Sequence, residues 1–300
     1  MLESISNQLR YRLVDVFSKK PLEGNGLAVF PHCQELSTEI MQKLTQEMRQ
    51  YESIFLYPTK ETHHFRARIF TMEEELDFAG HPILGAASTL HELMKNEEQQ
   101  KWVFELRTKN VSVTTVKKEK SYFATMEQGE PYFEQPLESG KNLKFLKAFN
   151  LSANDKHETL PLQVVSTGLS YLIIPVQCSL EKVEIVTKEL GQMLAEIGAK
   201  FAYILHVSQL EGRTWDNEGR VEDIATGSAA GPVGAYLIKH GIKQLNKEII
   251  LHQGRFLGRP SQIFITVRET SNQIHSVEVS GEVCMVARGI FDHLEVLEPV

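Results

Sequence analysis

Two stretches of the chain decide its fold: RIFTMEEELDFAGHPILGAASTL at residues 68–90 and RTWDNEGRVEDIATGSAAGPVGAYL at residues 213–237. In each, an arginine two positions before an aromatic residue leads through an acidic loop to a glycine followed by a polar residue. A run of small and apolar residues comes next, and a leucine follows the polar residue by nine positions, at Leu90 and Leu237. This internal repeat predicts two related halves, each with a strand that leads into an apolar helix.

The rest of the chain alternates short strand-like runs with a few helical ones. Helices are expected at 37–50, with Ser37 as the N-cap, and at 82–94, 187–197 and 229–241. The expected strands are 10–17, 26–30, 52–58, 64–71, 102–108, 111–116, 121–128, 162–168, 171–176, 201–208, 249–254, 263–269 and 276–292.

Composition restricts the function classes. Lys+Arg number 32 against Asp+Glu 39, a formal net charge of −7, which does not favour nucleic-acid binding. No apolar run reaches the ~18 residues that a membrane span needs, and the N-terminal residues do not resemble a secretory signal. The three cysteines, Cys33, Cys178 and Cys284, are far apart and form no disulfide framework, so a cytoplasmic location is expected.

The pairs Gly80-His81 and Gly227-Ser228 stand where the two apolar helices are expected to begin. Free backbone N–H groups and the positive end of the helix dipole make a helix start an anion site, and glycine allows close approach to the backbone. Two such helix starts predict a site for a small carboxylate. The alternative is that both are tight turns that pack a helix onto a sheet.

Glu52, His81 and Asp223 are the candidates for acid/base chemistry. Glu52 enters an apolar strand, Ser-Ile-Phe-Leu-Tyr, where a carboxylate is partly desolvated and suits a base that must also return a proton. Each has a simpler explanation: Glu52 as a solvent-facing loop residue, His81 as a structural donor, and Asp223 as a helix cap.

Motifs for bound cofactors are absent from the sequence. There is no HExxH, CxxC, GxGxxG or Walker A sequence and no GxSxG nucleophile elbow. His63-His64 has no third ligand nearby and is interpreted as a surface pair. We therefore expect no metal and no cofactor.

Six motifs in order resemble the phenazine-biosynthesis PhzF-like isomerase family, within the diaminopimelate epimerase-like fold. They begin with Val14-Asp15-Val16-Phe17 and Gly24-Asn25, and continue with Glu52 and Phe55, which are similar to a "SETxF" segment. The others are Arg68-Ile-Phe70-Thr71 with Phe78-Ala79-Gly80-His81, Ser166-Thr167-Gly168 with Pro175, Glu222-Asp223-Ile-Ala-Thr226-Gly227-Ser228-Ala229, and His252-Gln253-Gly254 with Gly258-Arg259.

The resemblance implies an α+β fold of two pseudo-symmetric halves, each a curved, mostly antiparallel sheet or barrel wrapped around a central helix. The expected halves are residues 1–118 with a C-terminal strand at about 288–300, and residues 119–287. An active site in the cleft between the halves is implied, in a cytoplasmic homodimer that needs no cofactor. The implied site residues are Glu52, His81 and Asp223 as catalytic groups, and Asn25, Gly80, Thr226, Gly227 and Ser228 as substrate-binding groups.

The implied activity is a proton shift on a small carboxylated metabolite by general acid/base catalysis. Epimerases of this fold use two cysteines at the ends of the two loops, where this chain has Ala79 or Gly80 and Thr226, so a two-thiol racemase is not expected. A non-thiol epimerase and a non-catalytic metabolite-binding protein stay as alternatives. The sequence departs from the family pattern at Met72, Asp77, Pro82 and Ile224, which bears on the substrate more than on the chemistry.

Overall fold

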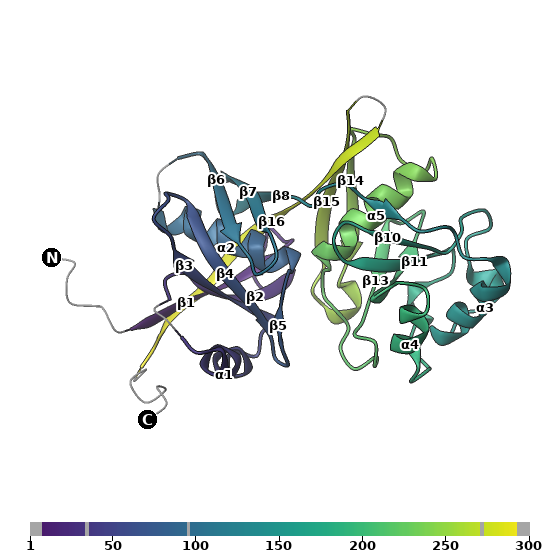
Figure 1. Cartoon of the computed structure of the whole chain (residues 1–300), viewed down its shortest axis with the longest axis horizontal. Coiled ribbons are helices and arrows are strands. Elements are labelled where there is room, and N and C mark those ends of the chain that lie inside the picture. Colours follow the sequence, from purple (N-terminus) through teal and green to yellow (C-terminus); the bar gives the residue numbers. More distant parts are fainter. Residues whose placement is uncertain (1–7, 34–35, 95–96, 271–272, 293–300) are drawn as a thin grey trace. The chain divides into compact units, whose positions relative to one another are not determined.

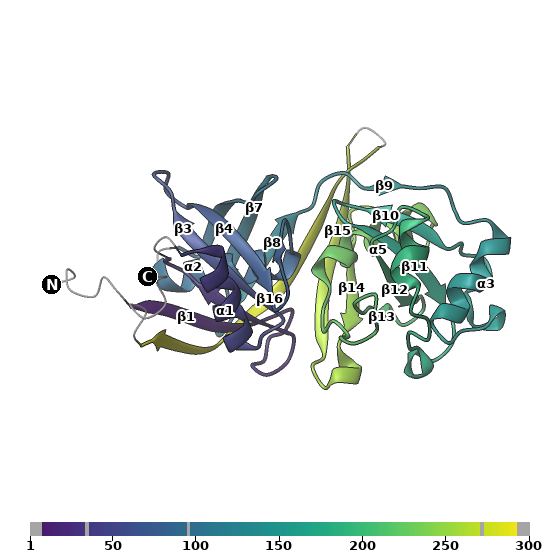
Figure 2. The same cartoon turned by 60° about the horizontal axis from the view of Figure 1, so that its bottom comes forward.

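The computed structural model describes residues 8–33, 36–94, 97–270 and 273–292. The chain divides into two compact units: unit 1 comprises residues 1–126 and 280–300, and unit 2 comprises residues 127–279. Figures 1 and 2 show that each unit combines a sheet with an apolar helix of its own, α2 in unit 1 and α5 in unit 2. No described helix is both long and apolar enough to cross a membrane.

Unit 1 is a closed ring of strands. Its sheet runs β1-β2-β3-β4-β6-β7-β8-β16, and β16 pairs with β1 to close the ring. The elements are β1 (Leu9–Val16), β2 (Asn25–Phe30), α1 (Thr38–Met48), β3 (Glu52–Pro58), β4 (His64–Thr71), β5 (Glu75–Leu76), α2 (Gly80–Met94), β6 (Gln99–Glu105), β7 (Asn110–Lys117), β8 (Tyr122–Glu127) and the later part of β16 (Gln273–Phe291).

Unit 2 has an open sheet in the order β9-β10-β11-β12-β13-β14-β15-β16, with α5 against β10, β11 and β15. Its elements are β9 (Tyr132–Phe133), α3 (Ser139–Ala148), β10 (Gln163–Ser166), β11 (Ser170–Val176), α4 (Leu190–Ala195), β12 (Phe201–His206), β13 (Glu211–Arg213), α5 (Gly227–Lys239), β14 (Glu248–Gln253), β15 (Ser261–Thr270) and the start of β16; three short 3-10 turns also occur, at Ala153–Asp155, Leu180–Lys182 and Arg255–Leu257.

The two units repeat one strand pattern. In unit 1 the pairs β1–β2, β3–β4 and β6–β7 are antiparallel, while β2–β3 and β4–β6 are parallel. In unit 2 the pairs β10–β11, β12–β13 and β14–β15 are antiparallel, while β11–β12 and β13–β14 are parallel. The expected α+β fold of two similar halves, each with a sheet around a central helix, is confirmed.

The arginines of the sequence repeat have the same role in both units. Arg68 binds Glu75 through two parallel bonds of 2.7 and 2.6 Å and lies over the Phe70 ring. Arg213 binds Glu222 in the same way, at 2.8 and 2.6 Å, and lies over the Trp215 ring. Such forked pairs have fixed geometry, so each ties the strand to the acidic loop that follows it.

Helix α2 lies inside unit 1, where every residue from Gly80 to His91 is buried. Close approach of the strands depends on Gly85, since a Cβ there would lie 2.4 Å from Leu27 Cδ2 and 3.1 Å from Val14 Cγ2. Helix α1 packs on β3 and β4, and its N-cap is Ser37, which accepts a hydrogen bond from the Ile40 N–H as expected.

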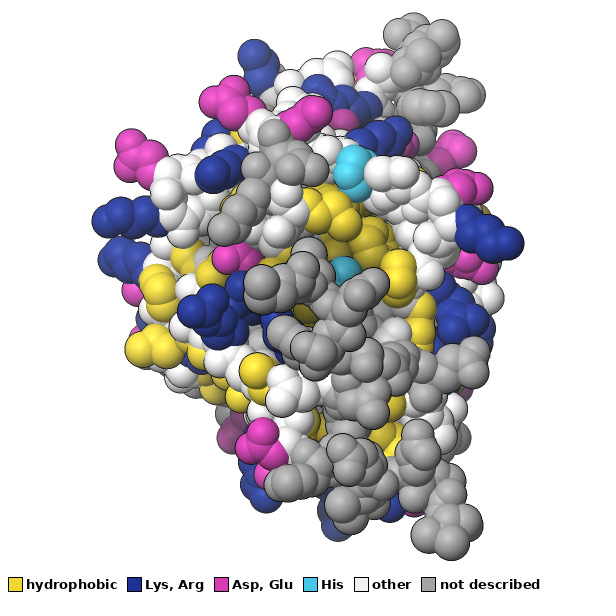
Figure 3. Space-filling model, turned by 90° about the vertical axis from the view of Figure 1, so that its left-hand side faces the viewer, with side chains coloured by type: hydrophobic (Ala, Val, Ile, Leu, Met, Phe, Trp, Pro, Cys, Tyr) yellow, Lys and Arg dark blue, Asp and Glu magenta, His cyan; other side chains and the backbone are white. Residues whose placement is uncertain are grey.

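Most expected elements are present. Helix α2 begins at Gly80, two residues before the expected start, and the expected helix at 187–197 is shorter, Leu190–Ala195. Helix α3 was missed because Gly140 and Asn142 have low helix propensity and only Phe145, Leu146 and Ala148 are buried in it. On the face shown in Figure 3, apolar side chains are visible among charged ones.

The two arginine–glutamate pairs differ in burial, which gives a matched test. The Arg213 and Glu222 side chains are 10% and 8% exposed, against 27% and 18% for Arg68 and Glu75. Removing one partner of a buried pair leaves an uncompensated charge and costs about 3–5 kcal/mol, whereas a pair that solvent reaches, as it does Arg68 and Glu75, is screened and contributes less.

Glu222→Gln is therefore expected to destabilise unit 2 more than Glu75→Gln destabilises unit 1. Urea unfolding followed by tryptophan fluorescence measures both effects, because Trp102 belongs to unit 1 and Trp215 to unit 2. Equal shifts of the two midpoints would contradict the assignment of Arg213–Glu222 as the buried anchor.

Gly85→Ala is expected to lower the free energy of unfolding by about 1–3 kcal/mol, the usual cost of overpacking a core. The control is Gly140→Ala in α3, where an added Cβ meets nothing within 4 Å and alanine favours the helix. Thermal unfolding of both variants measures the difference. A Gly85 variant as stable as the Gly140 variant would show that α2 does not need this close approach.

Candidate active site

Glu52 is the first residue of β3 and faces the start of α2. Its side chain is buried, with a residue exposure of 6%. Glu52 Oε2 lies 2.9 Å from Nε2 of His81, the second residue of α2, which is itself 4% exposed. The expectation of a desolvated carboxylate at this position is met, and the interpretation of Glu52 as a solvent-facing loop residue is wrong.

The side chains meet because of the strand register. Strands β2 and β3 are parallel, and Leu27 is the partner of Glu52. Alternation along β2 then places Asn25 on the same face as Leu27, whose side chain contacts Gly85 of α2. Asn25 is fully buried, and its Nδ2 lies 3.5 Å from His81 Nδ1. Unit 1 thus brings together Asn25, Glu52, Gly80 and His81.

Glu52 Oε2 lies close to His81 Nε2, but the geometry of the contact does not make a hydrogen bond. This buried oxygen receives no hydrogen bond from the described residues. Leaving a buried charged acceptor without a hydrogen bond is costly, and native proteins rarely do so outside functional sites.

Unit 2 gathers the other predicted residues around the start of α5. Thr226 Oγ1 donates to Asp223 Oδ2 at 2.6 Å, and the Ser228 hydroxyl lies 2.7 Å from the Tyr171 hydroxyl. Gly227 is the first residue of α5, and its carbonyl accepts from Gln128 Nε2 at 2.8 Å. Asp223 and Ser228 are half-buried and Thr226 is buried.

Several polar residues beside this loop were not predicted as site residues. Gln128 also accepts from Thr167 at 2.8 Å, and Gln253 accepts from Tyr203 at 3.0 Å. Gln253 and Thr167 carried a sequence signal, as parts of the segments His252-Gln253-Gly254 and Ser166-Thr167-Gly168. The others come from separate strands, and no spacing in the sequence could have joined them to the loop.

The cysteines are not placed for acid/base work. Burial raises the pKa of Cys33 to about 12 and that of Cys284 to about 11, and it also raises that of Cys178. None of the three belongs to the starts of α2 or α5. Thiols that stay protonated at neutral pH are poor bases, which agrees with the expectation that this is not a two-thiol racemase.

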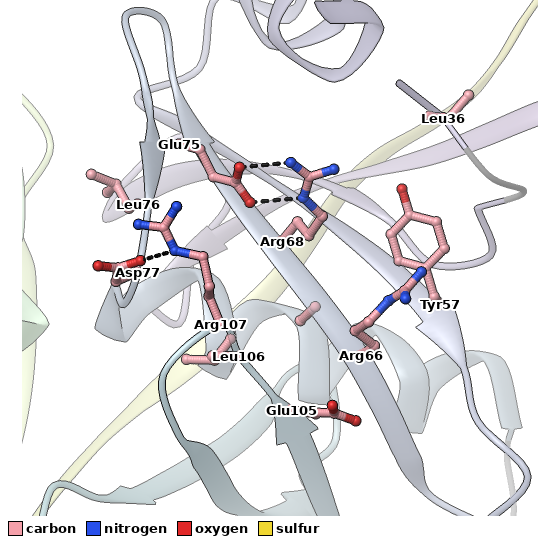
Figure 4. Close-up of a pocket in the computed structure, with 11 residues that line it drawn as sticks. Leu36, Tyr57, Arg66, Arg68, Glu75, Leu76, Asp77, Glu105, Leu106 and Arg107 are labelled. Carbon is pink, nitrogen blue, oxygen red and sulfur yellow. Dashed lines mark hydrogen bonds and ion pairs between the residues drawn. The ribbon is translucent and has the colours of Figure 1, made fainter. Parts of the chain in front are cut away.

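A groove of about 620 Å³ lies along β4, β5 and the end of β6 and contains none of the predicted site residues (Figure 4). Arg68 is paired with Glu75, and Arg107 with Asp77, one of the positions that depart from the family pattern. Its three arginines are balanced by three carboxylates, so charge alone favours no anion there. Among the described residues, no three His, Cys, Asp or Glu side chains are grouped as a metal ion would require.

Comparisons with known proteins match nearly the whole chain. The chain is 31% identical over 293 residues to trans-2,3-dihydro-3-hydroxyanthranilate isomerase of Pseudomonas chlororaphis, covering 93% of this chain and 98% of that enzyme.

Solved structures agree. A Pseudomonas aeruginosa protein described as a predicted epimerase has a TM-score of 0.89 at 47% identity, over 94% of this chain and 99% of that one. A PhzF-family phenazine biosynthesis protein of Bacillus anthracis has the same fold, with a TM-score of 0.82 at 22% identity, over 95% and 99% of the two chains. The family model described as phenazine biosynthesis-like protein matches residues 14–289. The chain therefore belongs to the phenazine biosynthesis-like (PhzF) family of isomerases.

Proposed function

We propose that the enzyme moves a proton between two carbons of a small carboxylated metabolite, with Glu52 as the base that removes and returns it. The observation that carries this proposal is the buried Oε2 of Glu52, which lies against His81 and receives no hydrogen bond from the described residues. A buried carboxylate held at short range from the substrate can remove a proton from one carbon and return one to another.

The other predicted residues have supporting roles in this proposal. His81 stabilises charge that develops on the substrate or relays a proton, and the N–H groups at Gly80 and at Gly227–Ser228 bind carboxylate oxygens. Asn25 and Thr226 orient polar groups, and Asp223 binds one. A cofactor has no part in these steps, and a homodimer in the cytoplasm stays our expectation.

The strand repeat favours an isomerase over an epimerase with two carboxylate bases. The register pairs Arg68 with Phe55 and Arg213 with Ile204, so Phe55 and Ile204 are equivalent. Glu52 precedes Phe55 by three residues, and the residue three before Ile204 is Phe201. The position in unit 2 that corresponds to Glu52 is therefore an aromatic residue without acid/base chemistry.

An epimerase is the second candidate, because the relative with 47% identity is described as a predicted epimerase. It would need a second acid from another position, such as His81 or Asp223. An isomerase changes the connectivity of hydrogen in the product, whereas an epimerase only inverts one centre. NMR of the product, which reports where hydrogen is bonded, and optical rotation on the same reaction therefore separate them.

The test is incorporation of deuterium from heavy water into a panel of small carboxylic acids. The panel includes trans-2,3-dihydro-3-hydroxyanthranilate, the compound in the name of the Pseudomonas chlororaphis relative. We expect the wild type to label one compound and Glu52→Gln to do so at least about 100-fold more slowly, as loss of a general base predicts.

The matched control is Glu282→Gln in the same unit. Glu282 is 8% exposed and accepts a hydrogen bond of 2.6 Å from Ser121, so it is buried but has a structural partner. The control should lose stability and keep its turnover, whereas Glu52→Gln should keep its melting temperature. Equal labelling by wild type and Glu52→Gln would refute the role of Glu52. Tight binding that survives Glu52→Gln, with no labelling by any variant, would instead support a metabolite-binding protein.

A further inference from the structure

Gln253, the last residue of β14, is 1% exposed and uses its whole side-chain amide on the loop before α5. Its Nε2 donates to the Asp223 carbonyl at 2.8 Å and to Thr226 Oγ1 at 3.0 Å. Its Oε1 accepts from the Thr226 N–H at 3.2 Å and from the Tyr203 hydroxyl at 3.0 Å. One buried side chain thus binds both ends of the segment from Asp223 to Thr226.

Two backbone groups fix which way round this amide lies. The Thr226 N–H can only donate, so it must face the oxygen of Gln253. The Asp223 carbonyl can only accept, so it must face the nitrogen. If the oxygen and nitrogen of the amide were swapped, the amide NH₂ would face the Thr226 N–H and the amide oxygen would face the Asp223 carbonyl. Neither contact could be a hydrogen bond, so the hydrogen-bond pattern by itself assigns the two atoms.

The direction of the Thr226 hydroxyl follows. Its oxygen already accepts from Gln253 Nε2, and the acceptor within reach of its own proton is Asp223 Oδ2, at 2.6 Å. Oδ2 therefore accepts in this contact. Gln253 thus determines, through Thr226, the direction of the hydrogen bond at this oxygen of Asp223.

The surroundings keep Gln253 in place. Tyr203 is fully buried, and burial raises its pKa well above the usual value, so its hydroxyl keeps its proton to donate. Gly212 makes room for this ring, since a Cβ there would lie 2.1 Å from Tyr203 Cε1. Gly254 has a φ of +84°, and a Cβ there would lie 2.7 Å from the Ile224 carbonyl oxygen, so the chain after Gln253 passes directly against the loop.

We propose that Gln253 is a positioning residue, which fixes the loop from Asp223 to Thr226 and so holds the Asp223 carboxyl group in place, with its Oδ2 accepting from Thr226. The inference rests on the proposed function only in giving Asp223 a substrate to bind. The hydrogen-bond direction itself is a property of the free protein and can be measured without turnover.

The test compares Gln253→Met with Gln163→Met, in which the amide is replaced by an apolar side chain of similar length. Gln163 is the matched control: it is fully buried in the same unit, and it bonds the Glu134 carbonyl at 2.7 Å and His240 at 2.8 Å, without contact to residues 223–228. Backbone amide exchange in heavy water should quicken at least about tenfold at Ala225–Ser228 in the Gln253 variant and stay unchanged there in the control.

Kinetics use deuterium incorporation into trans-2,3-dihydro-3-hydroxyanthranilate as the probe. The Gln253 variant should lose kcat at least about tenfold beyond any loss in the control. Gln253→Glu adds a pH signature: an ionised carboxylate cannot donate to Thr226, but a protonated one can, so this variant should regain turnover as the pH falls from 8 to 5.5. A residue that only supports the fold would give no such recovery.

Unchanged amide exchange at Ala225–Ser228 in Gln253→Met would overturn the proposal, as would losses of turnover that match the control. If the wild type does not label the probe, the proposed function fails for that compound, and the exchange data alone decide the role of Gln253.

Discussion

Enclosing a helix within its own sheet is the constraint on which the rest of this structure depends. Strands can approach the helix most closely at its glycines, because protein interiors are filled to the density of crystals. At Gly85 of α2 and Gly234 of α5, an added Cβ would lie 2.4 Å from Leu27 and from Ile265, respectively. The small residues that follow Gly80 and Gly227 are thus required by packing, whatever chemistry occurs at the helix starts.

This packing explains why the candidate chemistry lies at the helix starts. A helix that is buried along its length can expose backbone N–H groups only in its first turn, where they have no partner within the helix. The strands that surround it begin beside this turn, as β3 does at Glu52. A side chain at such a strand start is buried by the same closure that leaves the helix N–H groups available.

The two units use buried polar groups differently. The loop before α5 is held by hydrogen bonds: Thr226 donates to Asp223, and Gln253 donates to both of them. At the start of α2, Glu52 Oε2 is buried and lacks a hydrogen bond among the described residues. A fully bonded loop holds its geometry, whereas a buried carboxylate oxygen without a hydrogen bond is costly to keep. The two units therefore differ in how their buried polar groups are bonded, and this difference agrees with the proposal that Glu52 is the base.

The sequence by itself determined the repeat, most strands, the four helices with apolar periodicity and the family, because these depend on local spacing and on motifs within a few residues. Helix α3 was not predicted, because it has only ten residues and its apolar periodicity is weak. Only the tertiary structure decided that Glu52 is buried against His81, and that Gln253 and Tyr203 hold the loop at Asp223. Those contacts join residues up to fifty positions apart in the sequence. Such residues meet because of the register of the strands and the packing of the helix inside the sheet, and no local sequence pattern encodes either.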